Sequence, residues 1–313
     1  MSRRGKTLLI ITLLVALLFS GCAQTEGSVL VPGTEAFQFT DSLGRIVTLQ
    51  KRPERVVCLT ASYAETWMLA GGEVLATTSD ALERTELALP DNVQVVGTVK
   101  DPSYETIIAL DADFVLLSAD IPSHLSLGPV LDACGIAHAF FHVEQIEDYL
   151  AMLDICTELT GKEELYYQHG LKVQESINAI LASQRPAEDR PTYLLLRSYA
   201  TNVKAKGGDM MTARMLGDLS LTNICDLYPS LLEDLGMETI LNENPTYIFV
   251  IPMGSEESAQ ATMDNLLQTN AAFGQLDAVR QGRYHLLPKS LFHYKPNARW
   301  GESYAYLANI LSN

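Results

Sequence analysis

The 313-residue sequence lacks the local motifs that mark several large enzyme classes. It contains no GxSxG nucleophile turn, no GxGxxG after a strand candidate, no GxxxxGK[ST] phosphate loop and no HExxH zinc motif. Its five cysteines include no CxxC pair, which argues against a zinc ribbon, and its six histidines are scattered along the chain. The sequence therefore predicts no protein metal site and favours a binding protein over an enzyme.

Basic residues are also scarce. Lys and Arg number 22, against 38 Asp and Glu. Three of the basic residues and none of the acidic ones lie in the first 21 positions, so the rest of the chain carries 19 basic and 38 acidic residues, a formal net charge of −19. Such a charge argues against a nucleic-acid partner and against broad adhesion to anionic lipid.

A single long apolar run is present, TLLIITLLVALLF at residues 7–19. It follows basic residues, is too short to span a bilayer comfortably and has the proportions of a signal peptide. It ends in FSGC, which resembles the lipobox of bacterial lipoproteins, with Phe19 in place of the usual leucine. We therefore expect a signal peptide at 1–21, lipidation at Cys22 and a tether at 22–36, which makes the protein extracytoplasmic and lipid-anchored to the cell membrane. An ordinary secretory signal is the alternative.

The remaining cysteines each lie among apolar residues, as in VVCL and LDICTEL. An exported protein could pair them in disulfides. The apolar surroundings favour free thiols buried in the core. These residues are Cys58, Cys134, Cys156 and Cys225.

Short β-branched or aromatic runs alternate with segments of helical periodicity. Strands are predicted at 55–60, 113–118, 138–142, 192–198, 246–252 and 283–288, and helices at 63–70, 103–110, 123–133, 209–219, 231–242 and 256–269. This alternation is typical of an α/β fold with mostly parallel strands. Residues 145–187 read as helical, with a break near Gly161, and predict a long rigid helix that joins two Rossmann-like lobes at 37–144 and 188–313.

The two halves of the chain echo each other. ETIIALDADFVLL begins at Glu105 and ETILNENPTYIFV begins at Glu238. Each reads Glu-Thr-Ile, then a short polar turn, then an apolar strand opened by an aromatic residue. The echo favours two similar lobes over one continuous domain.

Ligands of open parallel sheets bind beyond the carboxyl ends of the strands. In the first half, Ser62 and Glu65 have capping-box spacing, which predicts that Tyr63 lies at an exposed helix N-terminus. In the second half such ends are basic and aromatic, and residues 278–301 hold no acidic residue. Each of these residues alone is more often a solvated or paired surface group. Together they favour an anionic, partly planar ligand. The predicted ligand-binding residues are Tyr63, Arg197, Tyr199, Lys204, His293, Tyr294, Lys295 and Arg299.

The order of these parts resembles the class III substrate-binding lipoproteins of ABC importers for ferric siderophores, haem and cobalamin. The most specific matches are GTVKDPSYETIIALDADFV at 97–115 and AVRQGRY at 278–284, and the likeness covers 36–313. The resemblance implies two α/β lobes joined by a rigid helix, with the ligand in the cleft between them and no enzyme activity. It also implies that Glu105 and Glu238 dock on arginines of a permease.

From this resemblance we expect a monomer, with no cofactor of its own, that delivers a ferric siderophore to a permease and ATPase complex. A cobalamin or haem receptor of the same importer type is the main alternative. Tyr63, Tyr199, His293 and Tyr294 are candidate axial ligands for haem. A surface α/β enzyme, or a sensor or adhesin without a transport partner, is less well supported.

Overall fold

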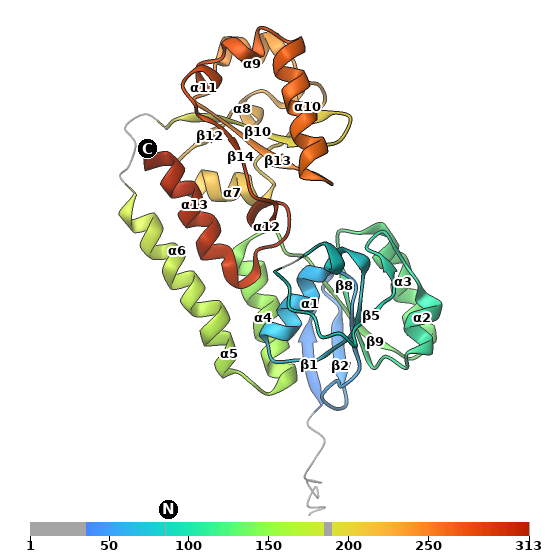
Figure 1. Ribbon diagram of the computed structural model, residues 1–313. Coiled ribbons are helices and arrows are strands. Elements are labelled where there is room, and N and C mark those ends of the chain that lie inside the picture. The colour runs from blue at the N-terminus through green and yellow to red at the C-terminus, as the bar shows by residue number, and fades with distance from the viewer. Residues whose placement is uncertain (1–35, 85, 185–189, 313) are drawn as a thin grey trace, which may run out of the picture. The chain divides into compact units, whose positions relative to one another are not determined.

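The computed structural model describes residues 36–84, 86–184 and 190–312 (Figure 1). The predicted signal peptide, the Cys22 lipidation site and nearly all of the predicted tether lie outside the described residues. No helix that the structure describes is both long enough and apolar enough to span a lipid bilayer.

The first half of the described chain is built on a parallel sheet with the strand order β5-β4-β3-β8-β9. Hairpins β1–β2 and β6–β7 stand beside it, and the whole is called the N-lobe. Its strands are β1 Phe37–Thr40, β2 Ile46–Leu49, β3 Val56–Cys58, β4 Val74–Thr77, β5 Gln94–Val95, β6 Gly97–Thr98, β7 Asp101–Pro102, β8 Phe114–Ser118 and β9 Ala137–Phe141. Its helices are α1 Ala61–Leu69, α2 Tyr104–Ala109 and α3 Pro122–Ala133. Because β4 lies on one side of β3 and β8 on the other, the topological switch point falls between β3 and β8.

A helical hairpin follows. Its helices are α4 Ile146–Thr160, α5 Glu164–Tyr166 and α6 Lys172–Ser183, and a π-helical turn at Tyr167–Leu171 joins α5 to α6. Gly161 ends α4 in the left-handed region with φ 70°, and the Tyr149 hydroxyl donates to the His169 carbonyl at 3.0 Å. The break expected near Gly161 thus reverses the chain, and the connection is two packed helical arms instead of one continuous helix.

The second half, called the C-lobe, has the strand order β11-β10-β13-β14, with β12 beside the start of β10. Strand β11 is antiparallel to β10, and the other pairs are parallel. The strands are β10 Thr192–Ser198, β11 Val203–Ala205, β12 Thr222–Asn223, β13 Tyr247–Pro252 and β14 Tyr284–Leu286. The helices are α7 Met211–Asp218, α8 Ile224–Leu227, α9 Met237–Glu243, α10 Glu256–Thr269, α11 Asp277–Arg280, α12 Lys289–Phe292 and α13 Trp300–Ser312. The switch point of this sheet lies between β10 and β13.

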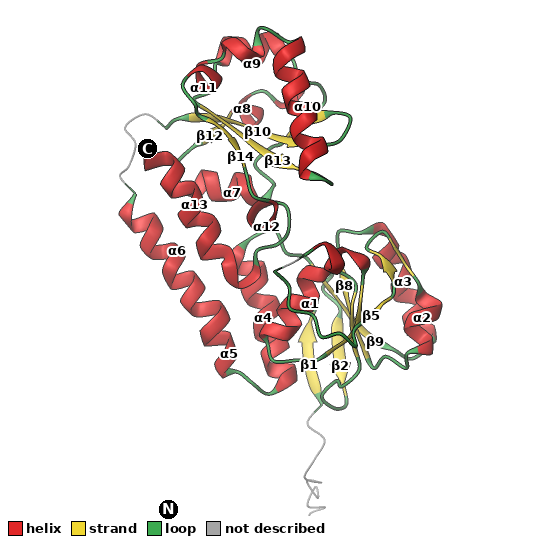
Figure 2. Cartoon of the chain, in the orientation of Figure 1, coloured by secondary structure: helices red, strands yellow, loops and turns green. Residues whose placement is uncertain are grey.

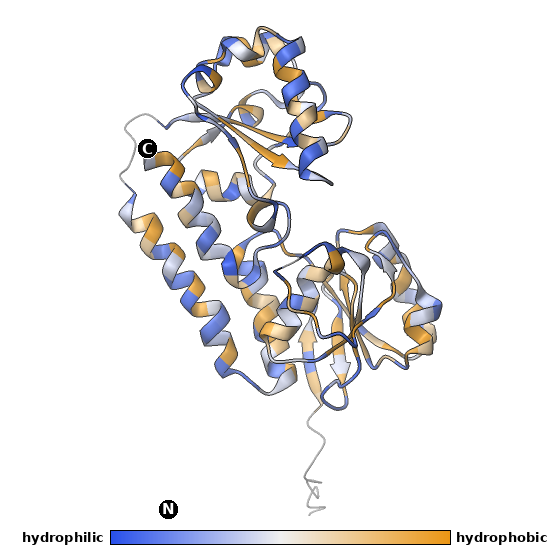
Figure 3. Ribbon diagram, viewed as in Figure 1, coloured by the Kyte–Doolittle hydropathy of each residue, from blue (hydrophilic) through white to orange (hydrophobic). Residues whose placement is uncertain are grey.

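Helices cover both faces of the C-lobe sheet (Figure 2). Leu194 and Leu196 of β10 pack under α8–α11, whereas Tyr193 and Leu195 face α7, α12 and α13. The second of these cores continues through α4 to one face of the N-lobe sheet, so both lobes and the hairpin share apolar packing. The strands are mainly hydrophobic, whereas α6 alternates in hydropathy along its length (Figure 3), as expected for strands buried on both faces and a helix with one exposed face.

The predicted α/β fold class is confirmed, and the six predicted strands match β3, β8, β9, β10, β13 and β14 with shifts at their ends. One predicted helix was wrong in its start, and one long helix was not predicted. The helix expected at 231–242 begins only at Met237, because Gly236 breaks the segment. Helix α13 was missed, although Trp300, Tyr304 and Leu307 have the spacing of a buried helical face.

Candidate ligand-binding site

Two predicted cations meet at the carboxyl end of β10. Arg197 is the penultimate residue of β10 and lies on the strand face that carries Tyr193 and Leu195. Across the β10–β11 pair it stands opposite Lys204, and opposed residues of antiparallel strands share a face of the sheet. Both side chains therefore belong to the same face, next to the C-lobe switch point.

His293 lies in this group, although it comes from the loop after α12. Burial, and then the charges of Lys289, Arg197 and Lys295 in that order, lower the pKa of His293 to about 4. The imidazole is therefore neutral near pH 7, within reach of three cations. The His293 and Tyr294 rings have centroids 4.9 Å apart.

Two buried nitrogens of this cluster lack a hydrogen-bond partner in the described structure: Arg197 Nε and His293 Nδ1. A buried polar atom left unpaired costs about 1–3 kcal/mol, and native proteins contain few of them. A ligand that brings acceptor atoms to Arg197 and a matching group to His293 would recover this cost. The two atoms thus favour a ligand that offers hydrogen-bond partners to both Arg197 and His293.

A pocket of about 540 Å³ adjoins the cluster and is lined by both lobes. The C-lobe wall includes Gly254 and Ser255, which follow β13, so the pocket opens at the carboxyl ends of the strands, as expected. The Tyr294 ring lies 5.1 Å from the Arg84 guanidinium and 5.3 Å from the Lys289 ammonium. The lining residues are Glu83, Glu86, Gly254, Ser255, Glu256, Pro288, Lys289, Ser290, Tyr294 and Arg299.

The predicted cations are not equally free to meet a ligand. Lys295 donates to the Glu144 carboxylate, and Arg299 Nε donates to Glu302 at 3.1 Å. Arg197 and Lys204 have no carboxylate partner among the residues that the structure describes. An anionic group would therefore gain most from Arg197, which is half-buried, and less from Lys204, which is exposed.

Part of the basic and aromatic stretch near the end of the chain binds the N-lobe. Asn297 Nδ2 donates to the Ser62 carbonyl at 2.9 Å and to Glu65 Oε2 at 2.7 Å. Arg84 donates to the same Glu65 oxygen at 2.7 Å. Sequence reasoning missed Arg84 and Asn297. The backbone of Asn297, with φ 52°, adopts a conformation that asparagine tolerates better than most residues, but nothing in the sequence pointed to its partners.

Tyr63 was expected to be exposed, and this interpretation was wrong. Its side chain is 5% exposed, and its hydroxyl donates to the Phe141 carbonyl at 2.7 Å. Helix α1 begins earlier than expected, with Thr60 and not Ser62 as its N-cap, and this turns Tyr63 into the core. Burial raises the pKa of its hydroxyl well above the usual range.

The other predicted residues lie at or near the surface. Glu105 and Glu238 are exposed and each is the second residue of its helix, α2 or α9. Tyr199 is half-buried just after β10, and its backbone N–H donates to the Asn202 carbonyl at 2.8 Å. All four cysteines that the structure describes are free, and burial was expected correctly for all but Cys134, which is exposed where α3 ends.

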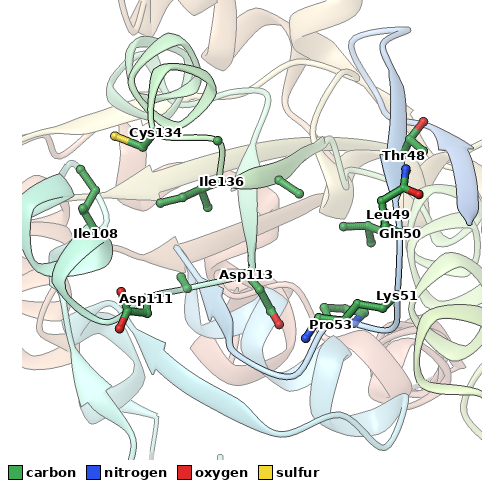
Figure 4. A pocket seen from close by; sticks show the side chains of 13 residues that line it. Thr48, Leu49, Gln50, Lys51, Pro53, Ile108, Asp111, Asp113, Cys134 and Ile136 are labelled. Atoms are coloured by element: carbon green, nitrogen blue, oxygen red, sulfur yellow. The ribbon is translucent and has the colours of Figure 1, made fainter. Parts of the chain in front are cut away.

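A second pocket of about 540 Å³ lies in the N-lobe (Figure 4). Figure 4 shows Ile108, Asp111 and Cys134 on one side of it and Gln50 and Lys51 on the other. Its lining residues include those that immediately precede β8 and β9, so it lies at the amino ends of the strands. Ligands of open α/β sheets bind at the opposite ends, so we do not assign the binding site to this pocket.

A family model described as periplasmic binding protein matches residues 56–291, about three quarters of the chain. The chain belongs to the periplasmic binding protein family. The match runs from β3 to α12, so it includes most of both lobes, the helical hairpin and Arg197, and it ends just before His293. Among curated proteins, no sequence matches this one.

Several solved structures share the fold. S. aureus IsdE complexed with haem has 14% identity and a TM-score of 0.68, with 83% of this chain and 99% of that chain covered. Staphylococcus aureus SirA complexed with staphyloferrin B has 16% identity and a TM-score of 0.64, with 88% and 97% covered. A periplasmic binding protein from Veillonella parvula has 18% identity and a TM-score of 0.71, with 89% and 91% covered. The TM-scores show that these proteins share the fold of this chain. Haem and staphyloferrin B are ligands of those proteins.

Proposed function

We propose that this periplasmic binding protein is the extracytoplasmic receptor of an ABC importer and that it delivers an anionic iron complex, a ferric siderophore first, to a membrane permease. The observation that carries the proposal is the pair of buried, unpartnered nitrogens at Arg197 and His293, within a cluster of cations at the carboxyl ends of β10 and β13. The chain is rich in acidic residues, so most of its surface repels an anion. The cationic cluster would therefore be the preferred place for an anionic ligand.

Two similar structures support the class of ligand, since one holds haem and the other staphyloferrin B. Siderophores bear hydroxamate, catecholate or carboxylate oxygens that accept hydrogen bonds from a guanidinium. Haem carries two carboxylates and remains the main alternative, together with cobalamin. The proposal includes no catalytic step.

A ligand panel tests this proposal. The full-length mature protein is titrated with a ferric carboxylate siderophore, a ferric hydroxamate siderophore, ferric haem and cobalamin, and binding is followed by calorimetry. We expect at least one ferric complex to bind with a Kd in the micromolar range or tighter. Binding of cobalamin alone would replace the iron proposal by its alternative, and binding of none of the four would refute both.

We further propose that Glu105 and Glu238 dock on arginines of the permease, one in each lobe. Both side chains are exposed in the first turn of a helix at matching positions of the two lobes. The competing explanation is that each only interacts with its helix dipole, which is worth less than about 1 kcal/mol of stability. Reversing both charges, Glu105→Arg with Glu238→Arg, should leave ligand affinity nearly unchanged and sharply reduce uptake by the reconstituted transporter. Normal uptake would leave only the helix-dipole role.

We also propose lipidation at Cys22, motivated by the FSGC sequence at the end of the apolar run. Intact-mass analysis of protein extracted from membranes should show a diacyl or triacyl adduct on Cys22. A released protein with an unmodified N-terminus elsewhere would refute the anchor. The same preparation should be monomeric by light scattering.

A further inference from the structure

Tyr63 was the one predicted ligand-binding residue in the N-lobe, and its side chain is buried. The side chains that follow β8 and β9 are therefore the ones to consider. Asp120 comes two residues after the end of β8, and His142 directly follows β9. Strands β8 and β9 are neighbours in register, with Ser118 opposite Phe141, so their carboxyl ends bring these two side chains together next to the N-lobe switch point.

The two side chains form a defined pair. His142 Nδ1 lies 2.7 Å from Asp120 Oδ1, and the side chains are 44% and 47% exposed. Because an ionised carboxylate only accepts hydrogen bonds, Nδ1 donates to Asp120, and Nε2 is the ring nitrogen left for a metal. Metal-binding histidines are commonly oriented in this way, by a carboxylate on the ring nitrogen that does not bind the metal.

The backbone around the pair is also fixed. The His142 N–H donates to Ser42 Oγ at 2.9 Å, and the preceding carbonyl, that of Phe141, accepts from the buried Tyr63 hydroxyl. Two residues further on, Glu144 binds Lys295 of the C-lobe. His142 thus lies on a rigid strand end, close to the point where the chain meets the cationic cluster.

We propose that His142, oriented by Asp120, is the N-lobe ligand to the iron of a bound complex that leaves at least one coordination position open. Ferric haem and ferric chelates with fewer than six donor atoms belong to this class. The described residues contain no group of three or more His, Cys, Asp or Glu that could hold a metal ion by themselves. The iron must therefore arrive with its chelator, and a single imidazole suffices to complete its coordination. The inference rests on the proposed function and narrows its ligand class.

Ferric haem and ferrioxamine B are suitable probes, because the first has an open axial position and the second fills all six positions of its iron. Bound haem should show imidazole ligation in its visible absorption and electron paramagnetic resonance spectra. His142→Ala should abolish this signature and weaken haem binding by at least tenfold. Asp120→Ala should weaken it by about tenfold, because it removes only the orienting carboxylate. His169→Ala, on the helical hairpin, is the matched control and should change neither value.

Each outcome bears on a separate claim. Ferrioxamine B should bind the parent and His142→Ala equally well or bind neither, because its iron offers no position for an imidazole. Haem bound by the parent without an imidazole signature, or with a signature that His142→Ala retains, would overturn the inference and leave the proposed function intact. If the parent bound neither haem nor any other ferric complex of the panel, the proposed function and this inference would both be overturned.

Discussion

The charged groups at the carboxyl ends of the strands are paired differently in the two sheets. On the N-lobe side two groups of charged side chains are paired: Arg84 binds Glu65 and Glu86, and Asp120 binds His142. On the C-lobe side Arg197 and His293 have unpartnered nitrogens, and Lys204 forms no ion pair among the residues that the structure describes. Both halves have parallel strands with helices between them, so the fold alone does not produce this difference.

The difference indicates that the charged groups of the N-lobe mainly stabilise the fold and those of the C-lobe mainly serve binding. A buried charge that is paired contributes to a fixed structure, because removing either partner leaves the other uncompensated. A buried donor that is unpaired costs stability and is retained where a ligand can complete it. We therefore expect substitutions of Arg84 to act mainly on stability and substitutions of Arg197 to act mainly on binding.

The largest effect is expected for Arg84→Ala. Arg84 is 2% exposed, and its loss would leave the Glu65 carboxylate without a cation, although Glu65 would still accept a hydrogen bond from Asn297. Breaking a buried pair of this kind typically costs about 3–5 kcal/mol of unfolding free energy. Urea unfolding of the mature protein measures the loss. Arg299→Ala, which breaks a more exposed pair with Glu302, is the matched control and should cost less than about 1 kcal/mol. Equal losses in both variants would break the comparison.

The next largest effect concerns pH and His293. Its pKa is lowered from 6.5 to about 4 in the folded protein, so between these values the unfolded chain binds a proton that the folded one does not. Stability should therefore fall as pH decreases from 6.5 towards 4, by up to about 3 kcal/mol from this group. Denaturant unfolding as a function of pH should show a shallower decline for His293→Gln.

Lys289→Ala sharpens the same measurement. Lys289 is the charged neighbour that lowers the pKa of His293 most, after burial. Its removal should raise that pKa towards the usual value and reduce the loss of stability on acidification. A decline identical in the parent, His293→Gln and Lys289→Ala would show that His293 is not held neutral by its surroundings.

A smaller free-energy change is expected for Arg197→Ala, although it should be decisive for function. Removing this proposed anion contact should weaken ligand binding at least tenfold, about 1.4 kcal/mol, with stability unchanged or slightly increased. Calorimetry with the ligand found in the panel measures the first effect, and urea unfolding measures the second. Arg190→Ala is the control, because this exposed arginine donates, among the described residues, to the main-chain carbonyls of Ser220 and Gly217. A destabilised variant with unchanged affinity would assign Arg197 a structural role.

The smallest effect on binding is expected for Lys295→Ala, because this ammonium already bonds Glu144. We expect affinity to change by less than about fivefold, within the range of a partly exposed ion pair. If Lys295→Ala weakened binding as much as Arg197→Ala, the ligand would reach further along the 290–300 segment than the pattern of free donors indicates. Calorimetry on the same ligand distinguishes the two results.

Much of the frame could be predicted from the sequence, because the relevant signals are local. Buried parallel strands are continuous apolar runs, so LLL at 194–196 and IFVI at 248–251 predicted their strands directly. The glycine at 161 predicted where the long helical segment breaks. The direction that the chain takes after this break could not be predicted, because it depends on Tyr149 meeting a carbonyl twenty residues away.

The sequence by itself determined the α/β alternation, the acidic balance and the set of basic and aromatic residues at the strand ends of the second half. Only the tertiary structure decided which of these residues are free. Lys295 bonds a glutamate 151 positions away, Asn297 reaches Glu65 across 232 positions, and Arg197 meets no carboxylate in the described chain. The reason is physical: strand and helix signals arise from neighbours along the chain, whereas the state of a charge depends on neighbours in space.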